Sequence, residues 1–140
     1  MRADNGQDTA APGAPGAQTP PAAAPRAEAA VTLRTHHTET GAAVCTIVGD
    51  LDFDTLAAVQ EGLTELVDEH PPVLVVDLAQ VGFCDSSGLN LLLRTRAAAV
   101  TAGTELRLAG VAPAVMRVLE LTGADTVFSL YDSVADALAA

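Results

Sequence analysis

The run Val73-Leu74-Val75-Val76, followed by Asp77, decides the fold that this sequence predicts. Four consecutive apolar residues, three of them β-branched, are typical of a strand that is buried on both faces, as strands are in a parallel sheet. Asp77 is expected to end this strand. Pro71 and Pro72 stand directly before the strand and end whatever helix precedes it, because proline cannot continue a helix.

Amphipathic helices are predicted on both sides of this strand. Between Leu56 and Val67 the apolar residues recur with a period near 3.6, which indicates a helix that Asp54 can cap. A second helix is expected from about Ser87, and Gly103 provides its stop signal. The central strand therefore lies between two helices, as it does in βαβ units.

The rest of the chain continues the same alternation. Further strands are predicted at 31–35, 43–48, 105–108 and 127–130, and further helices at 113–122 and about 132–139. The order β-β-α-β-α-β-α-β-α predicts an α/β fold with about four helices and a mixed, mostly parallel sheet of about five strands. The first two strands are expected to form an antiparallel hairpin.

Composition divides the chain near residue 30. Residues 1–30 contain 11 Ala, 5 Pro and 3 Gly and no Leu, Ile, Val, Phe, Tyr or Trp, so they are predicted to be a disordered extension. One folded domain is expected over residues 31–140. The whole chain has 140 residues and a formal charge of −11, and its 7 basic residues are all Arg. This balance makes a nucleic-acid-binding function improbable.

The sequence also argues against membrane and metal functions. No apolar run reaches the roughly 18 residues that a bilayer span needs, and the first residues lack the apolar region of a secretory signal. Cys45 and Cys84 fit neither a disulfide framework nor a metal site, which favours the reducing cytoplasm and a role as small buried apolar residues. No metal and no cofactor are expected.

The segment Phe83-Cys84-Asp85-Ser86-Ser87-Gly88-Leu89 stands where a buried strand meets a helix. Carboxyl ends of parallel strands are where sites form in α/β sheets, and a helix N-terminus attracts anions. A simpler interpretation stays open, because Asp85, Ser86 and Ser87 are all good N-cap residues. Asp50, Asp52 and Asp54 should lie on the same edge, either as a site or as a solvated loop with one cap.

Catalysis by Ser86 has little support in the sequence. The segment lacks the first glycine of a Gly-x-Ser-x-Gly elbow, and none of His36, His37 and His70 is a recognisable general base. A phosphate attached to Ser86 is chemically more reasonable, because a helix N-terminus tolerates a charge of about −1.5 to −2. The residues thus favour a binding module over an enzyme.

The sequence resembles the anti-sigma factor antagonists, which are stand-alone STAS domains of bacterial partner-switching systems. The resemblance covers about residues 31–138. Its landmarks are Gly49-Asp50-Leu51-Asp52, Val75-Val76-Asp77-Leu78, Phe83-Cys84-Asp85-Ser86-Ser87-Gly88-Leu89, Ala112-Pro113-Ala114-Val115 and Leu121-Thr122-Gly123. The resemblance implies a STAS-like fold and a cytoplasmic regulator of sigma factors.

The resemblance also implies a mechanism. The unphosphorylated protein would bind an anti-sigma factor, a serine/threonine kinase with an ATPase-like fold, and so release the sigma factor. Phosphorylation of Ser86 would reverse this, and a metal-dependent serine phosphatase would restore binding. Asp52 and Asp85 would take part in kinase recognition, while Ser87 and Gly88 would shape the turn that presents Ser86. Partners of this kind involve no nucleic acid and no membrane.

Two alternatives remain open at this point. The chain could be a non-switching STAS subunit of a scaffold or of a lipid-transport complex, or a small nucleotide- or lipid-binding domain. Arg94 and Arg96 follow Ser86 on the expected helix. They could contact a partner or be ordinary solvated charges, since exposed pairs contribute little.

Overall fold

The computed structural model describes residues 31–140, and the extension expected over residues 1–30 lies outside the described residues. The strands are β1 (Val31–His37), β2 (Ala43–Leu51), β3 (Val73–Cys84), β4 (Glu105–Ala109) and β5 (Ser129–Tyr131). The helices are α2 (Leu56–Asp68), α3 (Ser86–Ala102), α4 (Pro113–Thr122) and α5 (Val134–Ala139), with a 3₁₀ turn η3 (Ala124–Thr126). This element order confirms the predicted α/β fold.

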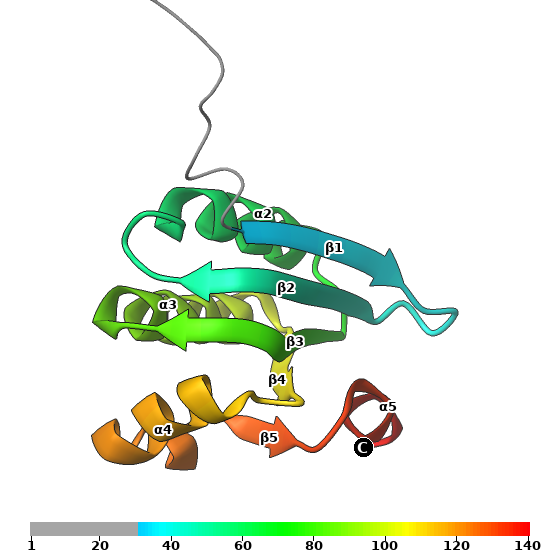
Figure 1. The fold of residues 1–140 in the computed structure, drawn as a ribbon. Coiled ribbons are helices and arrows are strands. Elements are labelled where there is room, and N and C mark those ends of the chain that lie inside the picture. Colours follow the sequence, from blue (N-terminus) through cyan, green and yellow to red (C-terminus); the bar gives the residue numbers. More distant parts are fainter. Residues whose placement is uncertain (1–30) are drawn as a thin grey trace, which may run out of the picture. The chain divides into compact units, whose positions relative to one another are not determined.

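All five strands of the described region belong to one sheet in the order β1-β2-β3-β4-β5 (Figure 1). The hairpin strand β1 is antiparallel to β2, and every later pair is parallel. Strand β3 occupies the centre, and its residues Leu74, Val75 and Val76 are completely buried. The prediction of a strand covered on both faces is therefore confirmed.

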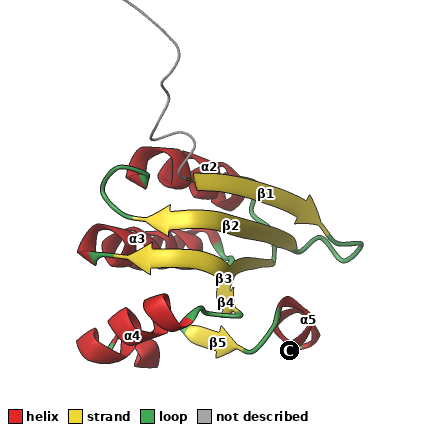
Figure 2. Ribbon diagram, viewed as in Figure 1, coloured by secondary structure: helices red, strands yellow, loops and turns green. Residues whose placement is uncertain are grey.

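Because side chains alternate along a strand, the two faces of the sheet have separate cores. On one face α2, α3 and α4 cover apolar side chains such as Ile47, Leu78 and Leu108. Figure 2 shows α2 and α3 side by side behind the sheet. On the opposite face Ala137 of α5 packs against a smaller cluster that includes Val75.

Strand β3 is longer than predicted, because Asp77 does not end it. The Asp77 carboxylate accepts hydrogen bonds from the Ala79 amide at 3.0 Å and from the Thr46 hydroxyl at 3.4 Å. These bonds satisfy the charged group inside the sheet, so the strand continues beside β2 as far as Cys84. The pairing shifts register twice on the way. The extension carries the chain directly to the start of α3.

The last strand also differs from the prediction of 127–130. After Gly123 the chain makes the turn η3, and the Val127 amide donates to the Ala124 carbonyl at 2.9 Å. This turn uses the backbone of Val127, so that pairing with β4 begins only at Ser129. Phe128, which the pattern assigned to the strand, is nevertheless buried in the core.

Arg107 connects the sheet to α5. Only 8% of this residue is exposed, and its Nη1 donates to the carbonyl of Ala137 at 2.6 Å and to that of Ala140 at 3.3 Å. Nε donates to the Glu105 carboxylate at 2.9 Å, a hydrogen bond that lowers the pKa of Glu105. The guanidinium also lies 5.8 Å from the centre of the Tyr131 ring. A buried charge is thus satisfied by the last helix.

Replacing Arg107 with Met is expected to loosen α5 selectively. Met keeps an apolar stem but has no N–H donor, so the two carbonyl oxygens lose their partner. We expect a loss of about 1–3 kcal/mol in the free energy of unfolding, measured in urea. Hydrogen exchange should accelerate first at the amides of residues 134–139.

Glu105→Gln is the matched control, because it keeps an oxygen for Nε and leaves the bonds to α5 intact. Unchanged exchange in α5 of the Arg107→Met protein would contradict the assigned role.

Candidate functional site

The loops that follow β2 and β3 lie against each other. These strands are adjacent and parallel, and the register places Asp50 opposite Phe83 and Leu51 opposite Cys84. The amide of Asp85 donates to the carbonyl of Leu51 at 3.1 Å, which joins the two strand ends. We call residues 50–54 and 83–88 together the acidic rim. Their proximity is the arrangement that the strand order predicts.

Asp85 is the N-cap of α3. Its backbone is extended, and its Oδ1 accepts hydrogen bonds from the amides of Ser87 at 2.9 Å and Gly88 at 3.1 Å. These bonds satisfy two of the free N–H groups at the start of the helix. The capping interpretation of Asp85 is therefore what the structure shows. Its carboxylate is turned toward its own helix and is only partly exposed.

Ser86 is the first residue of α3 and is exposed, whereas the following Ser87 is only partly exposed. The helix begins one residue earlier than the sequence predicts. Ser86 stands at the N-terminal end of a 17-residue helix, where the helix dipole would stabilise a negatively charged group. Of the two adjacent serines, Ser86 is the more accessible to another protein.

Gly88 allows α3 to approach the end of β2. A β-carbon at this position would lie 2.5 Å from the carbonyl oxygen of Leu51 and 2.8 Å from its Cβ. Both distances are too short for any side chain, and the first is to backbone. Gly88 thus lies within the first turn of α3 and permits the close contact that places Ser86 on the acidic rim. The contribution of Gly88 to this turn is steric.

Asp52 organises the other half of the rim. Its Oδ1 accepts hydrogen bonds from the amides of Asp54 at 2.9 Å and Thr55 at 3.1 Å. The hydroxyl of Thr55 donates to the carbonyl of Asp50 at 2.8 Å and is almost fully buried. The prediction that Asp54 caps α2 is wrong: Thr55 is the N-cap residue, and Asp52 already holds the Asp54 amide.

Two features of the rim are not predicted by the sequence pattern. One is the buried Thr55, for which the Asp-x-x-Thr spacing from Asp52 is the available signal. The other is the exposure of Phe53 and Phe83, since apolar residues beside a strand are normally expected in the core. No pattern in the sequence indicates it.

Cys84 stands two residues before Ser86 but is not a reactive group. It is buried, and burial raises the pKa of its thiol to about 11, with the negative charge of Asp85 acting in the same direction. Burial likewise raises the pKa of the Cys45 thiol to about 11. Both thiols stay protonated near neutral pH and are poor nucleophiles. Their expected role as buried apolar residues is confirmed.

The three histidines lie at the opposite end of the strands and helices. His36 and His37 pair with residues at the start of β2, and His70 Nδ1 lies 3.1 Å from the carbonyl of Ala102 at the end of α3. Along a 17-residue helix, that end is roughly 24 Å from Ser86. No histidine of residues 31–140 therefore reaches Ser86 as a general base.

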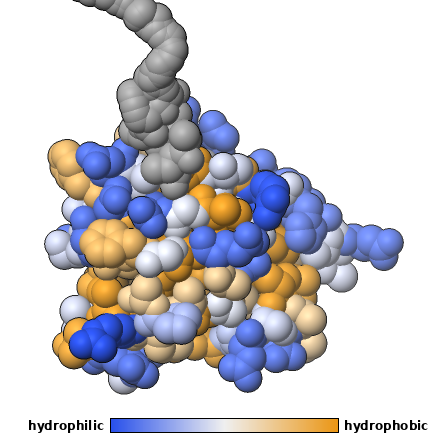
Figure 3. All heavy atoms as spheres, in the orientation of Figure 1, coloured by the Kyte–Doolittle hydropathy of each residue, from blue (hydrophilic) through white to orange (hydrophobic). Residues whose placement is uncertain are grey.

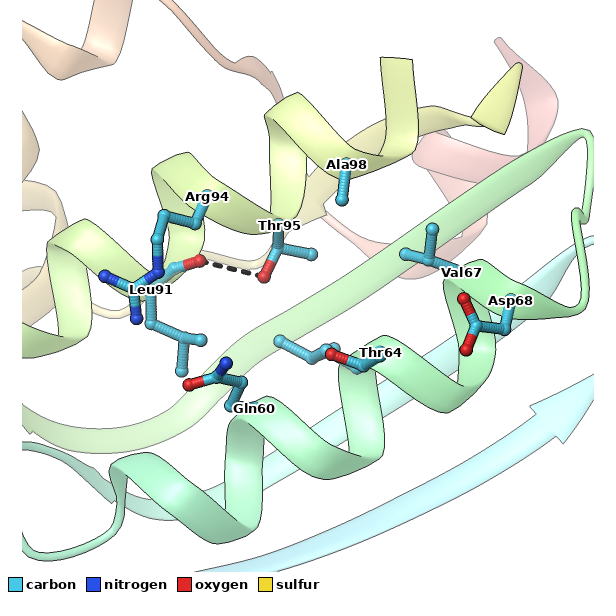
Figure 4. Close-up of a pocket in the computed structure, with 9 residues that line it drawn as sticks. Gln60, Thr64, Val67, Asp68, Leu91, Arg94, Thr95 and Ala98 are labelled. Atoms are coloured by element: carbon cyan, nitrogen blue, oxygen red, sulfur yellow. Dashed lines mark hydrogen bonds between the residues drawn. The ribbon is translucent and has the colours of Figure 1, made fainter. Parts of the chain in front are cut away.

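A groove of about 230 Å³ runs between α2 and α3, and Arg94 lines it (Figure 4). Leu63, Val67 and Leu91 form its apolar lining. Figure 4 shows Arg94 at one end of the groove and Asp68 toward the other. Arg94 and Arg96 are both exposed. Both alternatives for these arginines, partner contact and plain solvation, remain compatible with this placement.

Two further properties concern the described part of the chain. Within residues 31–140, His, Cys, Asp and Glu side chains form no group of three that could ligate a metal ion. None of the helices in the same range combines the length and apolarity needed to cross a bilayer.

Replacing Gly88 with Ala should destabilise the contact between α3 and β2. The new methyl group would overlap the Leu51 backbone, and overpacking of this kind costs about 1–3 kcal/mol. The matched control is Gly82→Ala on the same rim, where the nearest atom to a β-carbon is the Asp50 carboxylate at 3.6 Å. Chemical denaturation measures both. Equal stability of the two variants would disprove the close-approach argument.

Comparison with known proteins assigns the family. The STAS domain family matches residues 34–137. The anti-sigma-F factor antagonist RsfB of Mycobacterium tuberculosis is 36% identical over 110 residues, which cover 77% of this chain and 85% of that protein. An anti-sigma F factor antagonist of Paenibacillus polymyxa is 30% identical over 107 residues, or 74% of this chain and 87% of that one. The crystal structure of an anti-sigma factor antagonist from Mycobacterium paratuberculosis superposes with a TM-score of 0.68 at 33% identity, covering 78% of this chain and 92% of that chain. The chain therefore belongs to the STAS domain family, as the resemblance in its sequence predicted.

Proposed function

We propose that this chain is an anti-sigma factor antagonist that acts in the cytoplasm as a phosphorylation-controlled binding module. In its unphosphorylated form it binds an anti-sigma factor serine/threonine kinase with an ATPase-like fold, and the sigma factor is released. Phosphorylation on Ser86 ends this interaction, and a metal-dependent serine phosphatase restores it. The observation that carries the proposal is the exposed Ser86 at the N-terminus of α3, within a rim of carboxylates.

The local chemistry supports a modification that leaves the fold intact. Asp85 already caps α3 through the amides of Ser87 and Gly88, so a phosphate on Ser86 displaces no existing bond of that cap. The phosphate would stand at the positive end of the helix dipole, where negative charge is tolerated. The switch therefore acts on the surface of the protein rather than on its folding.

Charge supplies the switching force. A phosphate adds about −1.5 to −2 charge to a rim that holds Asp50, Asp52, Asp54 and Asp85. Two like charges about 6 Å apart, in an effective dielectric of about 20, repel by roughly 3 kcal/mol. Screening by salt reduces this value at an exposed position, yet about 1.4 kcal/mol already changes affinity tenfold. A partner that places negative groups opposite Ser86 would therefore be expelled.

The position of the histidines favours a binding function over hydrolysis. With no histidine of the described region near Ser86, a serine nucleophile would lack its general base. The identity to anti-sigma factor antagonists favours switching over a STAS subunit that serves only as a scaffold.

Incubation of the full chain with its cognate anti-sigma kinase and ATP should add one phosphate, located on Ser86 by mass spectrometry. Ser86→Ala should abolish the modification, because the acceptor hydroxyl is gone. Ser87→Ala is the control: it removes the neighbouring hydroxyl, which is less accessible, and should leave phosphorylation in place. Persistent modification of the Ser86→Ala protein would refute the assigned acceptor, and so would the absence of any modification by the kinase.

Asp52 should contribute to kinase recognition through its charge, in addition to its role in the loop. Asp52→Asn retains the oxygen that accepts from the amides of Asp54 and Thr55, whereas Asp52→Ala loses both that acceptor and the charge. We expect both variants to be phosphorylated at least about tenfold more slowly, a change equivalent to about 1.4 kcal/mol. Only Asp52→Ala should also lose about 1 kcal/mol of stability.

Initial phosphorylation rates and urea denaturation separate the two effects. If Asp52→Asn is phosphorylated at the wild-type rate, the role of Asp52 is confined to the geometry of the loop.

A further inference from the structure

Two phenylalanines are exposed on the acidic rim. Phe53 is 74% exposed and Phe83 is 51% exposed. The sequence contains only three phenylalanines and no tryptophan, and the third, Phe128, is buried. Two of the chain's few large aromatic side chains thus face solvent and contribute little to the core. The exposure of two aromatic rings on one surface points to contact with another molecule.

Both phenylalanines belong to the two strand ends that meet at the start of α3. Phe83 lies opposite Asp50 in the sheet. Phe53 comes two residues after Leu51, and the carbonyl of Leu51 accepts a hydrogen bond from the Asp85 amide at 3.1 Å. Ser86 comes directly after Asp85. Figure 3 shows apolar residues among hydrophilic ones at the edge where the arrows of β2 and β3 end in Figure 1. Among residues 31–140, the other large exposed apolar residues are Val100, Leu121 and Val127, which lie on or beyond the later parts of α3 and α4.

The charge around the phenylalanines specifies the partner. Segments 50–54 and 83–88 contain Asp50, Asp52, Asp54 and Asp85 but no Arg or Lys. The surface complementary to this combination is an apolar pocket bordered by basic side chains. Exposed aromatic residues of this kind are frequent energetic anchors of protein interfaces, because they bury a large rigid area at small entropic cost.

We propose that Phe53 and Phe83 are the apolar anchors by which the acidic rim binds its anti-sigma factor, which presents an apolar pocket bordered by Arg or Lys. This inference rests on the proposed function and adds the source of affinity. Seating the two rings brings the partner surface over Ser86. The basic side chains of the partner would face the carboxylates of residues 50–54, whereas its negative groups would face Ser86 and repel a phosphate there. The two rings would provide the affinity for the partner, and phosphorylation of Ser86 would control it.

The test measures the dissociation constant of the full chain with its cognate anti-sigma factor by titration calorimetry. Phe53→Ala and Phe83→Ala should each raise the dissociation constant at least about tenfold. Leu121→Ala is the matched control, because Leu121 is 75% exposed but lies at the end of α4. It should bind within about twofold of wild type. Circular dichroism checks that all variants remain folded, as exposed positions allow.

The outcomes separate this inference from the proposed function. If the wild-type chain binds no anti-sigma factor, the proposed function fails and the inference with it. If the wild-type chain binds the anti-sigma factor and both phenylalanine variants bind it with the same dissociation constant as wild type, the inference alone is overturned. Sedimentation of the free chain tests a second copy as the occupant: self-association that the phenylalanine variants lose would also overturn the assignment to the anti-sigma factor.

Discussion

The acidic rim depends on the close contact between the end of β2 and the start of α3. The Asp85 amide donates to the Leu51 carbonyl, and Gly88 removes the side chain that would otherwise collide with the same residue. Parallel pairing of β2 with β3 brings the two ends to one edge, but these contacts fix their relative height. The position of Ser86 therefore follows from backbone packing in the sheet, and surface side chains need not hold it.

The two halves of the acidic rim are stabilised by the same kind of hydrogen bonding. In each, an aspartate carboxylate accepts two backbone amides, Asp52 those of Asp54 and Thr55, and Asp85 those of Ser87 and Gly88. These acids have a structural use, yet each still brings its negative charge to the edge of the sheet. The same aspartates therefore have a structural and an electrostatic role. Substitution by Asn, which retains the accepting oxygen but removes the charge, separates the two roles.

The architecture could be read from sequence because its signals are local. The apolar run at 73–76 and the 3.6-residue periods on either side depend only on near neighbours, and strand order then brings Asp52 and Ser86 to one edge. The errors arose where a longer-range or competing contact decides. Thr46 satisfies Asp77 from the neighbouring strand, so β3 continues, and Asp52 takes the amide of Asp54, so α2 has Thr55 as its N-cap. The exposure of Phe53 depends on packing that no short pattern encodes.

The burial of both cysteines has a practical consequence for following this protein in solution. Cys45 and Cys84 are the chain's two cysteines, and both are shielded and protonated at neutral pH. A cysteine introduced at the exposed Asn90, one turn along α3 from Ser86, would be the single thiol able to take a fluorescent or spin label. The two native cysteines need not be replaced first, so a label can be attached beside the acidic rim without changing the core.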